Sequence, residues 1–391
     1  MHGIAEAETY FLPVYRRLPL EIQYGKGVYL YDRQGKAYLD FFSGLGVNAL
    51  GYQHPRVQQA IVRQLHRNLH LSNFFVQDVQ IALARKLLHH THYNRLFFTN
   101  SGTEAIEGIL KIVKKWGKER QKDHIICFEN AFHGRTLGAL SITAQKKYQN
   151  SFTPLLPGVV QLPYNDPDTL LATVNSRTAA IFLEFIQGEG GIVPARPEFV
   201  EAIQAARHHH ELLVVADEIQ AGVGRTGKFM AYQHFDFQPD LAASAKALGG
   251  GLPLGAFLVS APLVDVLQRG EHGTTFGGNP LSCAAGLAVI QEIEANNLLQ
   301  QVQQTGLYLL SRLQELQNEF PALIKTVRGM GLMAALEMHI ETFPLVLKGL
   351  EKGIVLNSTA GNVLRFLPPL IIETQHIDRG LEILRTLLKE L

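Results

Sequence analysis

The segment LLVVADEIQ, residues 212–220, decides the fold expected for this chain. Its five apolar residues predict a buried strand, and Asp217 and Glu218 follow directly. Acids at the carboxyl end of a parallel strand stand where open α/β sheets carry their chemistry. Further strand-like runs lie at 95–99, 124–129, 179–185, 241–245 and 255–260. Because these runs alternate with helical stretches such as 103–117 and 197–210, we expect an α/β fold with a mainly parallel, helix-covered sheet.

The pattern changes after Pro280. It predicts one long amphipathic helix to about residue 318, then shorter strands and a final helix from Ile377 to Glu390. We therefore expect a large domain over 51–280 and a smaller domain over 281–391, which the N-terminal segment 1–50 joins.

Lys246 lies in SAKALGGGLPLGA, residues 244–256, among small residues and directly before three glycines. Such neighbours let a flat ligand approach the amine, although a solvated loop lysine fits the local sequence equally well. Asp217 strengthens the catalytic interpretation. A lysine that holds an aldehyde as a Schiff base and an acid that keeps a pyridine nitrogen protonated are what a pyridoxal phosphate enzyme needs.

A phosphate-binding turn is predicted at NSGTEA, residues 100–105, which follows a short apolar strand and opens a helix. An ordinary helix N-cap explains the same residues. In AFHGRT, residues 131–136, Phe132 can stack on a planar ring and Arg135 can bind a carboxylate. We expect His133 to pack or stack, because no second metal ligand stands at a usual spacing.

Two acids lie in LEFIQGEGG, residues 183–191: Glu184 closes an apolar strand, and Glu189 lies in the glycine loop. Buried acids at these positions need partners, and we expect an arginine to supply one.

Together the motifs resemble the ornithine/acetylornithine branch of the class III, fold-type I pyridoxal phosphate aminotransferases. The resemblance spans essentially the whole chain. It also includes YLYDRQGKAYLDF (29–41), VNALGYQHP (47–55), DEIQAGVGRTGKF (217–229), HGTTFGGNPL (272–281), RGMGL (328–332) and GNVLRFLPPL (361–370). It implies a mainly parallel seven-stranded sheet in the large domain, a smaller α+β domain, and an aminotransferase that uses pyridoxal phosphate.

The resemblance also implies cofactor roles. Lys246 would hold the cofactor and move the proton, Asp217 would pair with the pyridine nitrogen, Gln220 would contact the ring hydroxyl, and Phe132 would stack on the ring. Phosphate contacts would come from Gly102 and Thr103 of one subunit and from Thr275 of the other. A homodimer with shared active sites follows from that arrangement.

For the substrates, the resemblance implies that Arg135 binds a carboxylate and that Arg365 binds the α-carboxylate of glutamate or 2-oxoglutarate. Glu189 would pair with Arg365 while a terminal amine reacts and would then release it. Tyr15 would also contact the substrate. The reaction would be a ping-pong transfer of a terminal amino group to 2-oxoglutarate.

The amino donor favoured by the sequence is N-acetylornithine, an acylated diamino acid used in arginine biosynthesis. Leu45 stands where enzymes similar to this one that act on free ornithine carry a tyrosine. Ornithine, succinylornithine and 4-aminobutyrate remain alternatives. Phe185, Ile106 and residues 76–78 depart from the family pattern, and we expect Phe185 to fill core.

Two other functions fit the sequence less well. GVGRTG, residues 222–227, matches the GxGxxG pattern of NAD-dependent dehydrogenases, but five residues separate it from the strand and no clear helix follows. A catalytically silent binding protein of the same fold would have no reason to keep Lys246, Asp217 and Arg365 together.

Composition sets further bounds. The net charge of +1 argues against a nucleic-acid surface. No apolar run approaches the length of a membrane span, and MHGIAEAETYFLPVYRR at the start lacks the pattern of a secretory signal. Cys127 and Cys283 fit buried, reduced thiols of a cytoplasmic protein. We expect no metal site, and we interpret His208, His209 and His210 as a solvated helix end.

Overall fold

The largest sheet of the molecule has seven strands. The computed structural model describes residues 2–391. The strand order is β4 (Arg95–Thr99), β12 (Gly255–Val259), β11 (Leu241–Ser244), β10 (Leu213–Asp217), β7 (Thr178–Leu183), β5 (His124–Phe128) and β6 (Val159–Leu162). Only β12 runs antiparallel to its neighbours in this sheet. The mainly parallel α/β sheet predicted from the strand-like runs is confirmed.

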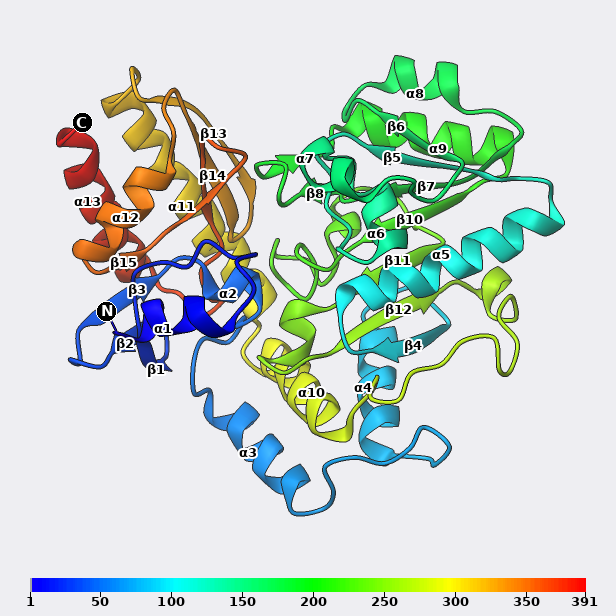
Figure 1. Ribbon diagram of the computed structural model, residues 1–391, viewed down its shortest axis with the longest axis horizontal. Helices are drawn as coiled ribbons and strands as arrows, with labels where there is room; N and C mark the ends of the chain where they lie inside the picture. Colours follow the sequence, from blue (N-terminus) through cyan, green and yellow to red (C-terminus); the bar gives the residue numbers. More distant parts are fainter. Residues whose placement is uncertain (1) are drawn as a thin grey trace.

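Helices cover both faces of this sheet, as Figure 1 shows. Successive side chains of one strand point to opposite faces of the sheet, so each strand contributes to both faces. Leu213 and Val215 pack in the cluster that contains α5 (Gly102–Glu119). Val214 and Ala216 pack in the cluster that contains α9 (Pro197–His210) and α10 (Pro280–Ala295). A strand buried on both faces explains the continuous apolar run that predicted it.

A second lobe holds two smaller sheets, on the left in Figure 1. One has the order β1 (Ile22–Lys26), β2 (Tyr29–Asp32), β3 (Ala37–Asp40) and β15 (Ile354–Val355). The other is antiparallel, with the order β13 (Ile324–Met330), β14 (Met333–Met338), β17 (Val363–Phe366) and β16 (Asn357–Thr359). The parallel pairing of β15 with β3 joins the N-terminal segment to the C-terminal part of the chain.

The single long helix expected after Pro280 is wrong. The structure has two helices, α10 and α11 (Leu298–Glu319), with Asn296 and Asn297 between them. Asn297 has φ 51°, and asparagine adopts this left-handed conformation more readily than most residues do. α10 is buried over most of its surface and packs against α3 (Pro55–Leu65) and α4 (Asp78–His89). In contrast, α11 packs against β13 in the second lobe.

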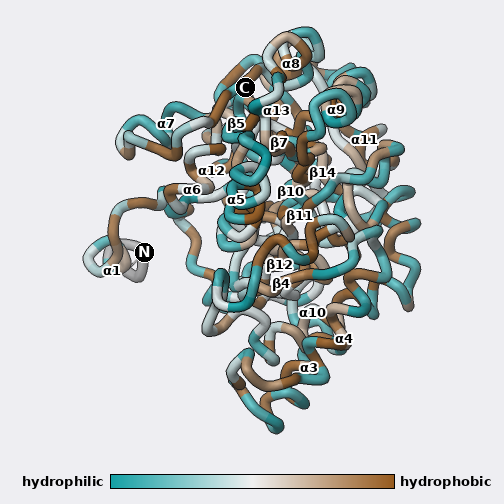
Figure 2. Tube along the Cα trace, turned by 90° about the vertical axis from the view of Figure 1, so that its right-hand side faces the viewer, coloured by the Kyte–Doolittle hydropathy of each residue, from teal (hydrophilic) through white to brown (hydrophobic). Residues whose placement is uncertain are grey.

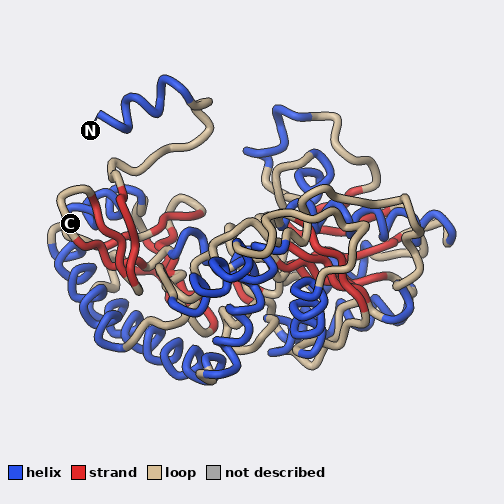
Figure 3. Tube along the Cα trace, turned by 90° about the horizontal axis from the view of Figure 1, so that it is seen from below, coloured by secondary structure: helices blue, strands red, loops and turns tan. Residues whose placement is uncertain are grey.

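The N-terminal helix α1 (His2–Tyr10) stands away from the rest of the molecule, as Figures 2 and 3 show. The segment that follows it exposes several large apolar side chains: Phe11, Leu12, Val14 and Tyr15. Of the expected N-terminal segment 1–50, Met1 lies outside the described residues. Within residues 2–391, no helix has the length and apolar character needed to cross a bilayer.

Candidate active site

A cavity of about 490 Å³ lies where several strands of the large sheet end. It collects residues from the loops that follow β4, β5, β7, β10 and β11, because parallel strands present their carboxyl ends at one edge. The expected site residues that line it are Gly102, Thr103, Phe132, Arg135, Glu189, Asp217, Gln220 and Lys246. Side chains from distant parts of the sequence therefore meet at one place.

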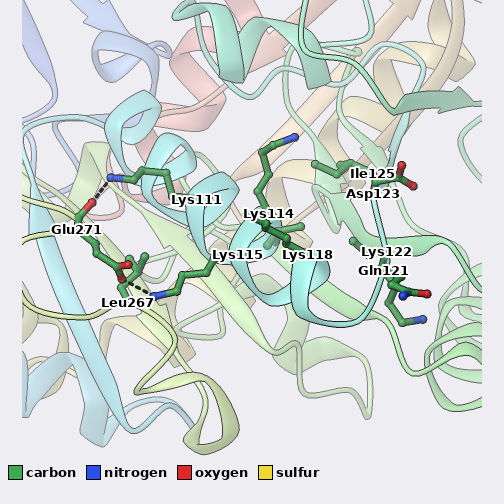
Figure 4. A pocket seen from close by; sticks show the side chains of 12 residues that line it. Lys111, Lys114, Lys115, Lys118, Gln121, Lys122, Asp123, Ile125, Leu267 and Glu271 are labelled. Carbon is green, nitrogen blue, oxygen red and sulfur yellow. Dashed lines mark hydrogen bonds and ion pairs between the residues drawn. The ribbon is translucent and has the colours of Figure 1, made fainter.

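A larger cavity of about 890 Å³ runs along α5 and is lined by five lysines (Figure 4). Several of these lysines have structural partners. Lys115 pairs with Glu271 at 2.6 Å, Lys111 bonds to the backbone oxygen of Glu271, and Lys122 donates to two backbone oxygens. None of the expected cofactor residues lines this cavity. We therefore place the candidate active site in the smaller cavity.

Lys246 follows β11 and begins the short helix η3 (Lys246–Gly249). Its φ of 48° lies in the left-handed region, which is strained for a lysine and recurs at functional sites. Burial lowers the pKa of the Lys246 amine to about 8, while the charge of Glu189 acts in the opposite direction. A lowered pKa leaves about a tenth of the amine neutral and nucleophilic at pH 7, far more than for an ordinary lysine.

Asp217 ends β10 and is 4% exposed. Its Oδ2 lies 2.7 Å from Nδ1 of the buried His133, and its Oδ1 accepts from the Ile219 amide at 3.0 Å. Burial alone would lower the pKa of His133, but the hydrogen bond and the charge of Asp217 raise it overall. The sequence suggested only packing or stacking for His133, so this partnership was missed.

Glu184 is buried beside this pair. Its carboxylate accepts from the backbone amides of Phe132 at 2.9 Å and Gly188 at 2.8 Å. Burial raises the pKa of Glu184 to about 7. Two backbone amides therefore hold Glu184, and the expected arginine partner belongs to Glu189 instead.

Arg365 lies on β17 and is 2% exposed. Its Nη1 lies 2.5 Å from Oε1 of Glu189 and 3.2 Å from Oε1 of Gln220, and its Nε donates to Asn357 at 2.8 Å. Burial opposes the ionisation of Glu189, but the charge and hydrogen bond of Arg365 hold its pKa below the usual value. Glu189 therefore covers one side of a buried, positively charged group.

The predicted phosphate turn forms the start of α5. Ser101 is the N-cap and accepts from the amide of Glu104, while the Glu104 carboxylate accepts from the Asn100 amide at 2.9 Å. A Cβ atom at Gly102 would lie 2.6 Å from Cδ1 of Ile219, so a larger residue fits only if Ile219 or the helix start moves. The amides of the first helical turn can bind an anion in the cavity.

Arg135 lies in the loop that follows β5 and lines the same cavity. Its guanidinium carbon lies 3.9 Å from the ring centroid of Tyr148. The Tyr148 ring also meets Phe132 edge to face, with centroids 6.1 Å apart. Tyr148 lies outside every sequence motif of the site, so no local pattern indicated it.

Comparison with known proteins decides the family. The sequence model described as "Aminotransferase class-III" matches residues 11–388. The chain belongs to the class III aminotransferases. This aminotransferase is 46% identical to the acetylornithine aminotransferase of Aquifex aeolicus, over 97% of its own chain and 100% of that relative. It is 43% identical to the acetylornithine aminotransferase of Methanocaldococcus jannaschii, with 95% and 94% covered.

Solved structures agree with this assignment. An ornithine aminotransferase from Toxoplasma gondii superposes with a TM-score of 0.94 at 32% identity, covering 99% of this chain and 94% of that one. An acetylornithine aminotransferase from Elizabethkingia anophelis gives a TM-score of 0.90 at 31% identity, with 100% and 99% covered. The expected membership of the class III aminotransferases and the fold-type I architecture are confirmed.

Pyridoxal phosphate is the cofactor of this aminotransferase family, and a structure of the Toxoplasma enzyme has it at partial occupancy in the active site. The residues of the present cavity fit such a group. They provide a buried amine, a strand-end acid held by a histidine, and a helix start at Gly102 whose free amides can bind a phosphate. The expected cofactor class is confirmed.

Three expected site residues of the aminotransferase do not line the cavity: Arg365, which contacts the lining residues Glu189 and Gln220, and also Tyr15 and Thr275. Tyr15 is 75% exposed, and Thr275 is also exposed. Neither lines the cavity around Lys246. Leu45 is not a lining residue either, but it forms a left-handed turn with Gly44 two residues before Val47, which lines the cavity.

Residues 222–227 and Phe185 of the aminotransferase have structural surroundings. Residues 222–227 form a buried turn, from which Arg225 donates to backbone oxygens of Leu332 and Pro368. No helix begins there, so a dinucleotide fingerprint is absent at these described residues. Phe185 is 1% exposed and packs against Phe235 and Phe237, which confirms that it fills core.

Proposed function

We propose that this aminotransferase transfers the terminal amino group of N-acetylornithine to 2-oxoglutarate, giving an aldehyde and glutamate. The ion pair between Glu189 and Arg365 beside Lys246 is the observation that carries the proposal. Arg365 is buried behind this pair, whereas Arg135 is exposed and lines the same cavity as Glu189. Relatives that carry the name acetylornithine aminotransferase over their full length support this donor and a place in arginine biosynthesis.

Pyridoxal phosphate, when bound, supplies the aldehyde and the ring that withdraws electrons from the substrate. Lys246 provides the amine that holds the cofactor and that later accepts and returns the substrate proton. Asp217 keeps a proton at the pyridine nitrogen, and His133 fixes the orientation of Asp217. Gly102 and Thr103 offer backbone amides to the phosphate. Gln220 and Phe132 would contact the ring oxygen and the ring face.

The two arginines divide the work on the substrates. Arg135 binds the carboxylate farther from the reacting amine, and its guanidinium is accessible for a bidentate contact. While a terminal amine reacts, Glu189 satisfies Arg365. When glutamate or 2-oxoglutarate binds, its α-carboxylate takes the place of Glu189 on Arg365. One cavity can therefore serve two substrates of different charge in turn.

Solved ornithine aminotransferases are also similar to this chain, so the donor must be measured. The decisive experiment compares kcat/KM for N-acetylornithine, N-succinylornithine, ornithine and 4-aminobutyrate. We expect N-acetylornithine to exceed ornithine by more than about tenfold, because Leu45 offers no polar group to a free α-amine. A preference of that size for ornithine or 4-aminobutyrate would refute the proposed donor.

The working unit is proposed to be a homodimer in which Thr275 reaches the phosphate site of the partner. Apolar side chains beside this loop support the proposal. Phe74, Phe75, Val76 and Phe276 are all more than half exposed. Asn73 donates to backbone oxygens of Thr274 and Gly277, which holds the two segments together. Tyr15 is proposed to complete the substrate site.

A cytoplasmic location is proposed because Cys127 and Cys283 are both free and buried. The division into a large domain over 51–280 and a smaller one over 281–391 with the N-terminal segment also stays a proposal. The pairing of β3 with β15 supports the inclusion of the N-terminal segment in the smaller domain.

A further inference from the structure

We propose that Thr359 and Arg328 are positioning residues for the Glu189 switch. They hold the backbone of the Glu189 loop, so that Glu189 leaves and regains Arg365 by rotation of its side chain alone. The inference rests on the proposed function, in which an α-carboxylate displaces Glu189 from Arg365. It adds to that function the residues that hold Glu189 in position to pair with Arg365.

Two hydrogen bonds carry the inference. Thr359 on β16 donates its hydroxyl to the backbone oxygen of Glu189 at 2.9 Å. Arg328 on β13 donates its Nε to the backbone oxygen of Gly191 at 2.8 Å. Both strands belong to the sheet that carries Arg365 on β17. One sheet thus binds the loop at three points, twice through its backbone and once through the Glu189 side chain.

The two backbone contacts are built to persist when the ion pair opens. Arg328 is anchored by Glu337, which also binds Lys325 at 2.7 Å. A Cβ atom at Gly191 would lie 3.1 Å from Nη2 of Arg328, so glycine allows the close approach. At the other end of the loop, Glu184 accepts from the Gly188 amide at 2.8 Å. Loss of the Glu189–Arg365 pair therefore leaves the loop fixed.

There is also room for the side chain to move. Besides the Lys246 cavity, Glu189 lines a second cavity of about 410 Å³ together with Gly190, Ala360, Lys146 and Lys147. One further acid, Glu129, also lines this cavity, so the two lysines outnumber it and favour a departing carboxylate. A loop fixed at its backbone and a space beside Glu189 together favour a switch that works by rotamer exchange.

A fixed backbone keeps the Glu189 carboxylate close to Arg365 and thereby favours the closed pair. Without Thr359 the loop would sample more positions, and the closed pair would form less readily. Terminal-amine donors, which need Arg365 covered, would then react more slowly. The kcat/KM for glutamate, which needs Arg365 uncovered, would fall less or would rise. The ratio of the two specificity constants therefore reports on the contact.

The test uses the full-length holoenzyme with Thr359→Val, which removes the hydroxyl, and Thr359→Ser, which keeps it. Both half-reactions are measured separately by single-turnover absorbance. For Thr359→Val we expect the terminal-amine to glutamate ratio of kcat/KM to fall roughly 3- to 10-fold, as one hydrogen bond allows. Thr359→Ser should restore the parental ratio.

Arg328→Met should shift the ratio in the same direction. Its matched control is Lys325→Met, which removes the other partner of Glu337 on the same strand but does not reach the loop. Hydrogen exchange of a peptide covering residues 186–194 gives a readout independent of activity. We expect faster exchange in Thr359→Val and Arg328→Met and parental exchange in Lys325→Met.

An equal loss in both half-reactions would overturn the inference, because it would show a general structural role. An unchanged ratio would overturn it as well. The terminal amine used is the one that the parent enzyme prefers, so an error in the proposed donor leaves this test intact. A parent that accepts no terminal amine would instead refute the proposed function.

Discussion

At the scale of single residues, Lys246 combines a strained backbone with a buried amine. We expect Lys246→Ala to reduce turnover by about 10³-fold or more, because the variant lacks both the attacking amine and the proton carrier. Cofactor should still bind without a covalent bond, which dialysis and absorbance spectra can measure. Lys114→Ala on the exposed side of α5 is the control and should keep parental activity. Full activity of Lys246→Ala would remove the lysine from the mechanism.

The pH dependence of cofactor binding follows from the same amine. Burial lowers the pKa of Lys246 to about 8, below its usual 10.5, so the neutral, reactive form dominates above pH 8 and the protonated form dominates below it. The rate at which apoenzyme recombines with pyridoxal phosphate should therefore rise through about pH 8 and level off above it. Stopped-flow absorbance across pH 6–10 measures this rate. A rise centred near pH 10.5 would contradict the proposed effect of burial.

At the scale of elements, the start of α5 depends on one close contact. Gly102→Ala would place a Cβ atom 2.6 Å from Cδ1 of Ile219, so the Ile219 side chain or the helix start must shift, which disturbs the phosphate position. We expect the Kd for pyridoxal phosphate to rise about tenfold, which fluorescence titration can measure.

The matched test of this contact is the double variant Gly102→Ala, Ile219→Ala. It removes the side chain that the new Cβ would meet, so part of the lost affinity should return. An equally weak double variant would show that the defect lies in the helix backbone and not in the contact.

The helices after Pro280 show where a local sequence pattern gives a wrong prediction. The apolar pattern after Pro280 continues through Asn296 and Asn297, yet the chain turns there and begins α11. A single left-handed residue is enough to end a helix, and neighbouring apolar residues do not reveal it. α10 is buried on most sides because α3 and α4 pack against it, which a helical period cannot predict.

At the scale of the whole molecule, the exposed segment 74–76 and Phe276 predict an interface with a second copy. The double variant Phe74→Asp, Phe276→Asp should be monomeric and should lose about tenfold or more of its activity, because the partner's loop is then missing from the site. Light scattering coupled to gel filtration measures the state of assembly. Leu307→Asp, at a 70% exposed position on α11, is the control. A monomeric variant with full activity would refute the shared site.

Much of the fold followed from local pattern. Buried strands such as β7 and β10 appear as apolar runs of the correct length, because their residues are covered on both faces. The residues that bear the chemistry follow such strands directly, which is why Asp217 and Lys246 could be selected. Tyr148 could not be selected, because its importance comes from the ring contacts that it makes with Phe132 and Arg135.

By itself, then, the sequence determined the α/β class, the strand-end residues and the family. Each of these features depends on a stretch of a few residues, in which the hydrophobic period and the types of side chain occur together. Only the tertiary structure decided which residues contact one another. His133 meets Asp217 across 84 residues, and Thr359 meets the Glu189 backbone across 170. Such contacts depend on strand order and on the packing of one sheet against another, which no local stretch of sequence encodes.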